Sequence, residues 1–465
     1  MKKKGIDNKS AGRLRLPRTL GQCIGATFVI VEEIIDHKES VSTAWDNAMS
    51  ITGLPPDVRK NGMNIFLTLL GTILDMKGTQ SKLVKDLLNP CLKDWINAMD
   101  EILDEMNLEW LDFQCVVVKS LHRLCKDYSL SITVSQMKSI LPHLWKLMNY
   151  TYFYWKYCCI FSEIDIQQLS SKSCPPSFQS DIAIIKKKAS KESGEEKDKD
   201  KEGGGDEEDA LVNNMVRLLD LCYLFLSSLI GHKNNKWQNL IEEKLTDIID
   251  LCIQLSMLTH DHIRLFEDDP EEFISAELDS FKAGDLRSSM KNALGHFLDL
   301  KPANDSGKSA YDSILVSAQR ILKESITTEA SYGWKLREAA IGAFELLADD
   351  AVDISELAST QLKFPIEEFI PNVLYKDIQS QNVHLQNRAL WCLSHFVPLM
   401  GVQHQVSLLN SPIVHQCFTI KNCVIVRFAA TRYIHIHTHT NIPNFFVVFQ
   451  NNENVQFNEL QSFLC

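Results

Sequence analysis

The sequence predicts an all-α fold in which pairs of helices repeat and stack side by side into a solenoid. Glycine and proline, which favour turns, are rare in this chain. It holds 19 glycines and 14 prolines among 465 residues, a combined share below the roughly 12% that is usual for these two residues. Apolar residues recur at helical intervals in both halves of the chain, and similar arginine-led openings return at nearly constant spacing. These three observations together favour long helices in a repeated array.

The helical intervals are clearest in three segments. In the segment 112–125 the apolar positions are four, four and three residues apart, which makes one stripe of an amphipathic helix. The stripes are Phe113, Val117, Leu121 and Leu124; Leu336, Ala340, Phe344 and Leu347; and Leu385, Ala389, Leu393 and Phe396. No comparable alternation typical of a strand precedes residue 433. We therefore expect helices over these segments and no sheet.

The repeat is read from the arginines that open apolar-striped helices, namely Arg59, Arg337, Arg388 and Arg427. Arg388 and Arg427 are 39 residues apart, close to the roughly 40–47 residues of a helix-pair repeat. The 51 residues between Arg337 and Arg388 leave room for a longer loop at 349–364. Each arginine can pair with an acid from an adjacent turn, which would form a ladder along the concave side. Alternatively, these are surface arginines on unrelated helices.

One charged run divides the chain. Between 186 and 209 the sequence holds 7 lysines and 10 acidic residues in 24 positions. Such a run does not recover its ordering entropy, so we expect a disordered linker. It separates helical repeats at 20–165 and 210–435, with a disordered basic N-terminus at 1–19 and an atypical tail at 436–465. Prolines are expected to stop or turn helices, among them Pro142, Pro270, Pro371 and Pro398.

Charge and cysteine content exclude several classes of protein. The chain has 60 acidic and 48 basic residues and a formal net charge of −12 at pH 7, which suits a basic protein partner and argues against direct nucleic-acid binding. Its 13 cysteines form no CxxC pair and no secretory leader precedes them, so we expect reduced, buried thiols. The apolar stretch 218–230 contains Asp220 and is shorter than the roughly 20 residues a bilayer needs. We therefore expect a soluble protein without membrane contact.

Three strings of residues point to a known family. They are Trp334-Lys335-Leu336-Arg337-Glu338-Ala339, the string from Asn387 to Phe396, and Leu258-Thr259 followed by the string from Phe266 to Phe273. These strings resemble the importin-beta (karyopherin-beta) superfamily, and within it most closely the carriers of histones and ribosomal proteins. The resemblance covers 210–435 well and 20–165 only in helical texture. It implies a right-handed superhelix of HEAT (ARM-like) repeats.

The resemblance also implies a function, that of a nuclear transport receptor and not an enzyme. Such receptors bind basic protein cargo on the concave face, release it when the GTP form of the small GTPase Ran binds, contact nucleoporins, and occupy both cytoplasm and nucleus. They are considerably longer than this chain, and their Ran-binding repeats lie at an N-terminus that has no clear counterpart before residue 20. We therefore expect a partial chain. A structural HEAT scaffold for one stable partner, with no transport role, is the alternative function.

Two acidic segments are candidates for holding basic cargo. The first is an acidic loop near 267–279, in which Pro270 keeps the backbone extended between Glu267, Asp268, Asp269, Glu271 and Glu272. The second is the end of the charged run, at Asp206, Glu207, Glu208 and Asp209. Complementary charge of this kind mainly raises the association rate and selects partners. The alternatives are a solvated loop for the first segment and an entropic spacer for the second.

Other chemistry is weakly represented, and we expect no metal and no cofactor. His435, His437 and His439 alternate, which would suit zinc or copper on an extended segment, but their spacing matches no structural zinc site. Gly307-Lys308-Ser309 ends like a phosphate-binding loop but lacks its opening glycine. The aromatic run at 150–157 could stack bases, although packing between helices is favoured because Lys156 is its only basic residue.

Overall fold

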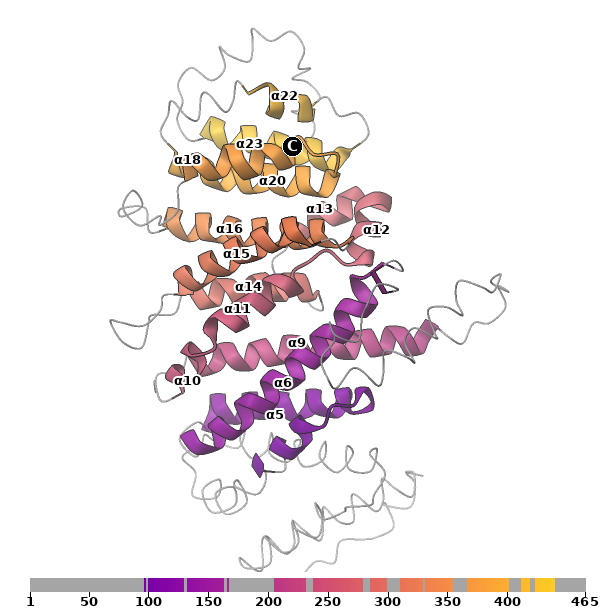
Figure 1. Ribbon diagram of the computed structural model, residues 1–465, viewed down its shortest axis with the longest axis vertical. Helices are drawn as coiled ribbons and strands as arrows, with labels where there is room; N and C mark the ends of the chain where they lie inside the picture. Colours follow the sequence, from indigo (N-terminus) through magenta and orange to yellow (C-terminus); the bar gives the residue numbers. More distant parts are fainter. Residues whose placement is uncertain are drawn as a thin grey trace, which may run out of the picture. The chain divides into compact units, whose positions relative to one another are not determined.

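The computed structural model describes residues 96–97, 99–128, 132–162, 165–166, 205–230, 237–278, 285–298, 310–328, 331–353, 366–400, 411–418 and 423–439. Among these residues every regular element is a helix, as drawn in Figure 1. The predictions for 1–19, for 20–95, for 186–204 and for 440–465 lie outside the described residues. Two compact units are distinguished, 1–150 and 151–465, with their boundary inside helix α6 (Val134–Cys159).

The first unit contains η2 (Leu108–Trp110), α5 (Leu111–Tyr128) and the larger part of α6. The predicted stripe of α5 is confirmed, because Phe113, Val117, Leu121 and Leu124 are all at most 3% exposed. Asp100 accepts a hydrogen bond from Ser139 on α6 and lies 2.8 Å from the Nδ1 atom of His143. These polar contacts fix how the segment around Asp100 packs along α6 beside the apolar core.

In the second unit seven longer helices form a stack. Their bounds are α9 (Gly205–Ile230), α11 (Leu245–Leu255), α14 (Leu286–Leu298), α15 (Ala310–Thr327), α16 (Gly333–Asp353), α20 (Val383–Phe396) and α23 (Val424–His439). Helix α9 packs on α14, α11 on α14 and α15, α15 on α16, α16 on α20, and α20 on α23. Contacts between successive helices confirm the predicted all-α class of stacked helical repeats.

Shorter elements link the stack. They are α10 (Gln238–Glu242), α12 (His260–Asp268), α13 (Pro270–Leu278), α18 (Ile366–Phe369), η5 (Ile370–Leu374), α19 (Tyr375–Ile378), η6 (Val397–Leu399) and α22 (Pro412–Phe418). The apolar stripes of α16 and α20 face the core as predicted, with each stripe residue at most 7% exposed. Ala389, Ala429 and Ala430 are fully buried, which lets α20 and α23 approach closely.

Several predicted boundaries differ from the structure. Pro142 lies inside α6 instead of ending it, and Pro371 lies within a π-helical turn, η5, that joins α18 to α19. Helix α9 begins at Gly205, so the last residues of the run 186–209 are helical. Helix α23 continues to His439, beyond the expected start of the tail at 436. Proline alone therefore does not end a helix whose neighbouring turns remain packed.

Helix α9 is longer than the apolar stretch 218–230, which by itself is too short to cross a bilayer. Over Asp209–Leu229 it is, by length and composition only, long and apolar enough to cross a membrane, with 39% of that span buried. This is weak evidence for a membrane, because a core helix of a soluble protein meets the same criterion. Here the buried side of α9 packs against α14 and α10.

The aromatic run at 150–157 packs between helices, as favoured from the sequence. Tyr154 and Trp155 are 4% and 1% exposed. The hydroxyl of Tyr152 donates a 2.7 Å hydrogen bond to Oε1 of Gln254 on α11. The rings of Tyr154 and Trp155 are thus covered by the core and not open for stacking on bases. The described cysteines are free thiols and most of them are buried, which agrees with the expectation of reduced thiols.

Candidate functional site

The first acidic candidate is a turn between two short helices, and we call residues 267–272 the acidic turn. Thr259 caps the start of α12, since its Oγ1 accepts a hydrogen bond from the backbone N–H of His262. Pro270 occupies the first position of α13, where the missing N–H costs no helical hydrogen bond. The carboxylate of Asp269 accepts a 3.0 Å bond from the N–H of Glu272. Two helices therefore replace the predicted loop.

Two phenylalanines anchor the acidic turn to the stack. The rings of Phe266 and Phe273 meet edge to face with centroids 5.1 Å apart, and each is at most 5% exposed. Phe266 also contacts the ring of His384 on α20 at 4.3 Å, and His384 stacks on Trp334 of α16 at 5.0 Å. We call these four residues the aromatic clamp. It holds the turn at a fixed place on the stack.

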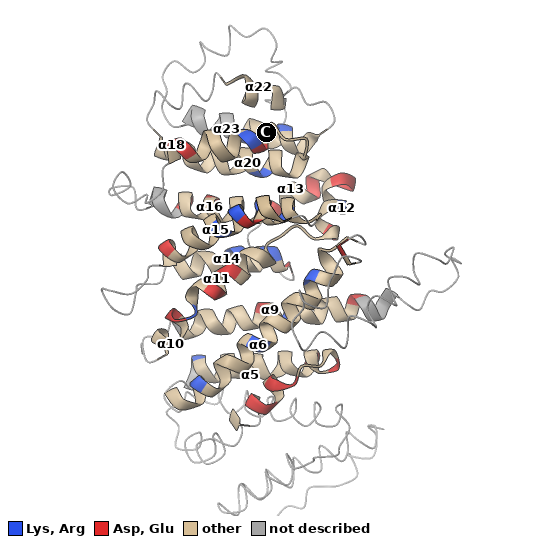
Figure 2. Ribbon diagram, in the orientation of Figure 1, with Lys and Arg blue, Asp and Glu red and all other residues tan. Residues whose placement is uncertain are grey.

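The clamp leaves the carboxylates in solvent. All five predicted residues of the turn are exposed, namely Glu267, Asp268, Asp269, Glu271 and Glu272, and Figure 2 shows acidic residues gathered on α12 and α13. Of the second candidate segment, Asp206 to Asp209 begin α9. Asp209 is exposed, whereas the side chains of Asp206, Glu207 and Glu208 lie outside what the structure describes. The turn is thus the candidate whose geometry is known.

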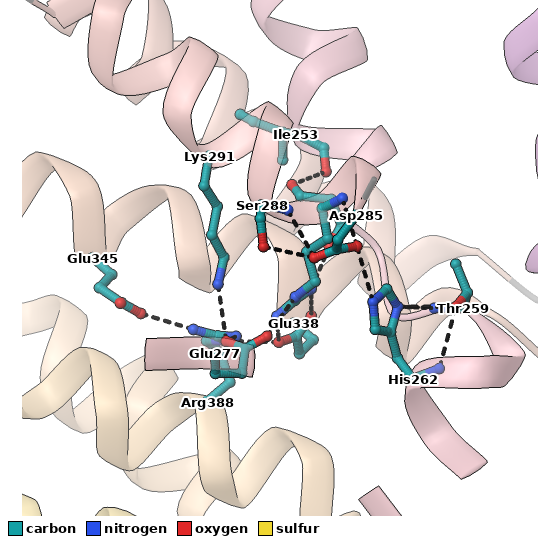
Figure 3. A network of polar contacts seen from close by, with 12 residues as sticks. Ile253, Thr259, His262, Glu277, Asp285, Ser288, Lys291, Glu338, Glu345 and Arg388 are labelled. Atoms are coloured by element: carbon teal, nitrogen blue, oxygen red, sulfur yellow. Dashed lines mark hydrogen bonds and ion pairs between the residues drawn. The ribbon is translucent and has the colours of Figure 1, made fainter. Parts of the chain in front are cut away.

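A second group of charges is buried. We call it the ion network, and its members come from four helices (Figure 3): Glu277, Arg287, Lys291, Glu338, Glu345 and Arg388. Arg388 is 1% exposed and lies 2.7 Å from Glu338 and 2.9 Å from Glu345. Arg287 is 3% exposed and lies 2.7 Å from Glu338. The network thus ties α14 and α20 to the same carboxylate of α16.

Mutual attraction keeps these groups charged despite their burial. Burial alone would raise the pKa of Glu338, but the neighbouring Arg287 and Arg388 guanidinium groups outweigh it and lower this pKa to about 2. Burial alone would also raise the pKa of Glu277. The same two arginines together with Lys291 outweigh burial, so the pKa of Glu277 falls well below its ordinary value. Glu277 and Glu338 therefore stay ionised within the buried network because the neighbouring cations compensate them.

The predicted arginine ladder is confirmed in part. Arg388 pairs with acids of α16 as described, and Arg337 lies 2.7 Å from Asp377 on α19. Arg427 breaks the pattern, because its buried Nε atom has no hydrogen-bond partner. Arg287 and Glu277 were not predicted, since neither belongs to a recurring opening. Their helices also carry other charged or polar residues, so the sequence offers no signal that singles these two out.

Acidification is expected to destabilise the second unit through His384, which is 7% exposed. Burial lowers the pKa of His384 from its ordinary 6.5 to about 4. The unfolded chain thus binds a proton at this histidine between these values and the folded chain does not, so stability is full above pH 6.5 and falls as the pH drops toward 4. This one group should reduce the free energy of unfolding by about 2 kcal/mol between about pH 7.5 and about pH 5.

Urea unfolding at the two pH values measures this effect, with His384→Phe as the comparison because phenylalanine keeps an aromatic ring against Trp334. The variant should lose about 2 kcal/mol of the pH dependence. An unchanged pH dependence in His384→Phe would show that His384 is not the titrating group.

Metal and phosphate chemistry gain no support from the described residues. No group of three potential metal ligands lies together among them. The side chains of His435, His437 and His439 lie outside the described part, as does the string Gly307-Lys308-Ser309.

The chain is similar to one protein family and to several solved structures. A family model described as Cse1 matches residues 211–433. Similar solved structures include "the exportin Cse1 in its cargo-free, cytoplasmic state", with 13% identity, a TM-score of 0.34, and coverage of 90% of this chain and 57% of that one. Lph2, described as a bidirectional nuclear transport receptor in S. cerevisiae, is 11% identical with a TM-score of 0.40, and the match covers 96% of this chain and 47% of that one. Kap121p bound to the C-terminus of the phosphatase Cdc14p is 12% identical with a TM-score of 0.34, and the match covers 96% of this chain and 47% of that one.

This chain spans about half the length of these three proteins. The part that the Cse1 model covers runs from α9 to α23 and contains the acidic turn, the aromatic clamp and the ion network. Residues 211–433 are thus similar to the Cse1 family.

Proposed function

We propose that the chain is the cargo-holding part of a nuclear transport receptor that carries basic proteins, such as histones or ribosomal proteins, into the nucleus. The observation that carries this proposal is the acidic turn, where five carboxylates are exposed on a segment anchored by Phe266 and Phe273. A fixed cluster of negative charge attracts lysine-rich and arginine-rich surfaces and selects them over acidic ones. The match of residues 211–433 to the Cse1 family model supports the same proposal, and the quoted strings resemble importin nine most closely within the importin-beta superfamily.

Regulation by Ran is part of the proposal. Cargo and the GTP form of Ran would favour mutually exclusive curvatures of the stack, so that binding of one weakens binding of the other. Nucleoporins would bind the same receptor during passage between cytoplasm and nucleus. The test is to add Ran-GTP to the chain loaded with core histones. Release of the histones supports the import role, and retention or tighter binding contradicts it.

Neutralising the acidic turn is expected to weaken histone binding about tenfold or more at about 150 mM salt, and much less at about 500 mM, because exposed charges are screened. The variant is Glu267→Gln, Asp268→Asn, Glu271→Gln and Glu272→Gln together. Asp269 is left in place because it caps α13. Fluorescence anisotropy with a labelled core histone measures the dissociation constant.

The matched control neutralises four exposed carboxylates elsewhere, Glu101, Glu105, Glu109 and Glu243. It removes the same net charge from the chain. If the two quadruple variants lose histone affinity equally, the turn has no special part in cargo binding and only overall charge matters.

A further inference from the structure

Glu277 is the only member of the ion network on α13, and it contacts cations on two other helices. Its carboxylate lies 2.7 Å from the Nε atom of Arg287 and 2.9 Å from the Nζ atom of Lys291, both on α14. It lies 2.5 Å from the Nη2 atom of Arg388 on α20. Figure 3 shows Lys291 and Arg388 beside Glu277. Three cationic side chains thus surround one carboxylate, an arrangement typical of a carboxylate-binding site.

Little else holds α13 in place. Of its nine residues only Phe273 is buried, while Leu278 is 53% exposed and Glu271, Glu272 and Ser275 face solvent. Besides its packing on α12 and α23, the helix is attached to the stack mainly by the ring of Phe273 and the carboxylate of Glu277. An element with so few buried apolar contacts opens more readily than the helices of the core.

The remaining charges of the network do not balance without Glu277. If Glu277 is withdrawn, Arg287 and Arg388 still pair with Glu338, and Arg388 still pairs with Glu345. The only carboxylate within ion-pair distance of Lys291 among the described residues is Glu277. Withdrawal of Glu277 would therefore leave three cations facing two carboxylates in a buried place, and an uncompensated buried charge is costly. The site requires one further anion.

We propose that Arg287, Lys291 and Arg388 form a carboxylate-binding site that Glu277 occupies from within the chain, and that α13 is the latch of this site. When α13 opens, the site takes a glutamate or aspartate side chain from an acidic peptide. The latch and the external carboxylate then exclude each other, so that the free chain is inhibited by its own Glu277. This inference does not rest on the proposed binding of basic cargo, which uses the exposed turn.

The first test is rescue of Glu277→Ala by a small carboxylate. In hydrogen exchange, the amides of α14 and α20 should exchange at least about tenfold faster in this variant than in the unchanged chain. Sodium acetate should restore much of the protection, whereas sodium chloride or acetamide at equal concentration should not. The control Glu272→Ala removes an exposed carboxylate from the same helix and should respond to none of them. Equal effects of acetate and chloride on Glu277→Ala would overturn the proposal.

The second test uses an oligoglutamate peptide and holds even if Glu277→Ala is poorly folded. In the unchanged chain, the amides of α13 should exchange at least about tenfold faster than those of α16, and the peptide should raise exchange in α13 further by holding the latch open. Anisotropy should show at least about tenfold tighter peptide binding to a folded Glu277→Gln variant, because the internal competitor is neutralised. Exchange of α13 only together with α16, with no response to the peptide, would overturn the latch.

Discussion

Replacing Arg388 by alanine is expected to lower the free energy of unfolding of the second unit by about 3–5 kcal/mol. The guanidinium is 1% exposed and lies within 3 Å of Glu277, Glu338 and Glu345. Its removal leaves carboxylates buried beside a single remaining arginine and a lysine, and it also opens a cavity between α16 and α20. Urea unfolding followed by far-ultraviolet circular dichroism measures the loss.

The matched control is Arg320→Ala, which also removes an arginine that makes two ion pairs. Arg320 is 48% exposed and lies 2.9 Å from Asp250 and 3.0 Å from Glu324. Solvent screens such pairs, so the control should lose no more than about 1 kcal/mol. Similar losses in the two variants would mean that burial adds nothing to the ion network.

The helical stack was predictable because its signal is local and repeated. The stripes beginning at Leu336 and Leu385 follow from intervals of three and four residues, and burial of every stripe residue confirms them. The pairing of Arg388 with an acid was predictable in kind, since a charged residue on a buried face requires a partner.

The identity of the partners was not predictable. Arg287 pairs with Glu338 across 51 residues of chain, and Arg388 with Glu277 across 111. No interval within a helix encodes such separations, because they depend on how four helices, α13, α14, α16 and α20, stack. The ion network is therefore a product of tertiary structure.

The acidic turn shows how proline can mislead. The sequence Asp268-Asp269-Pro270-Glu271 suggests extended backbone, and Asp269 ends α12 with a non-helical backbone, at φ −137° and ψ 78°. The same proline then starts α13, because its fixed φ angle suits a first helical turn and two glutamates follow it there. Exposure of the five carboxylates could be anticipated from composition, but the anchoring by Phe266 through His384 and Trp334 could not.

The second large effect is expected from Phe266→Ala, which should cost about 3–5 kcal/mol of unfolding free energy if α12 and α13 unfold with the stack. Phe266 is 5% exposed and joins Phe273 to His384. Hydrogen exchange of 260–278 and urea unfolding distinguish local opening from global loss. The control Leu278→Ala, at a position 53% exposed on the same helix pair, should change stability by less than about 0.5 kcal/mol.

Phe266→Ala should also act on His384, and this second consequence identifies the clamp as the cause. Burial is the largest influence lowering the pKa of His384 to about 4, and Phe266 covers one side of its ring. Removing that cover admits water, so the pKa of His384 should rise toward its ordinary 6.5. The loss of stability between about pH 7.5 and about pH 5 should then shrink in Phe266→Ala. A variant that is destabilised at neutral pH but keeps the full pH dependence would show that other side chains, not Phe266, exclude water from His384.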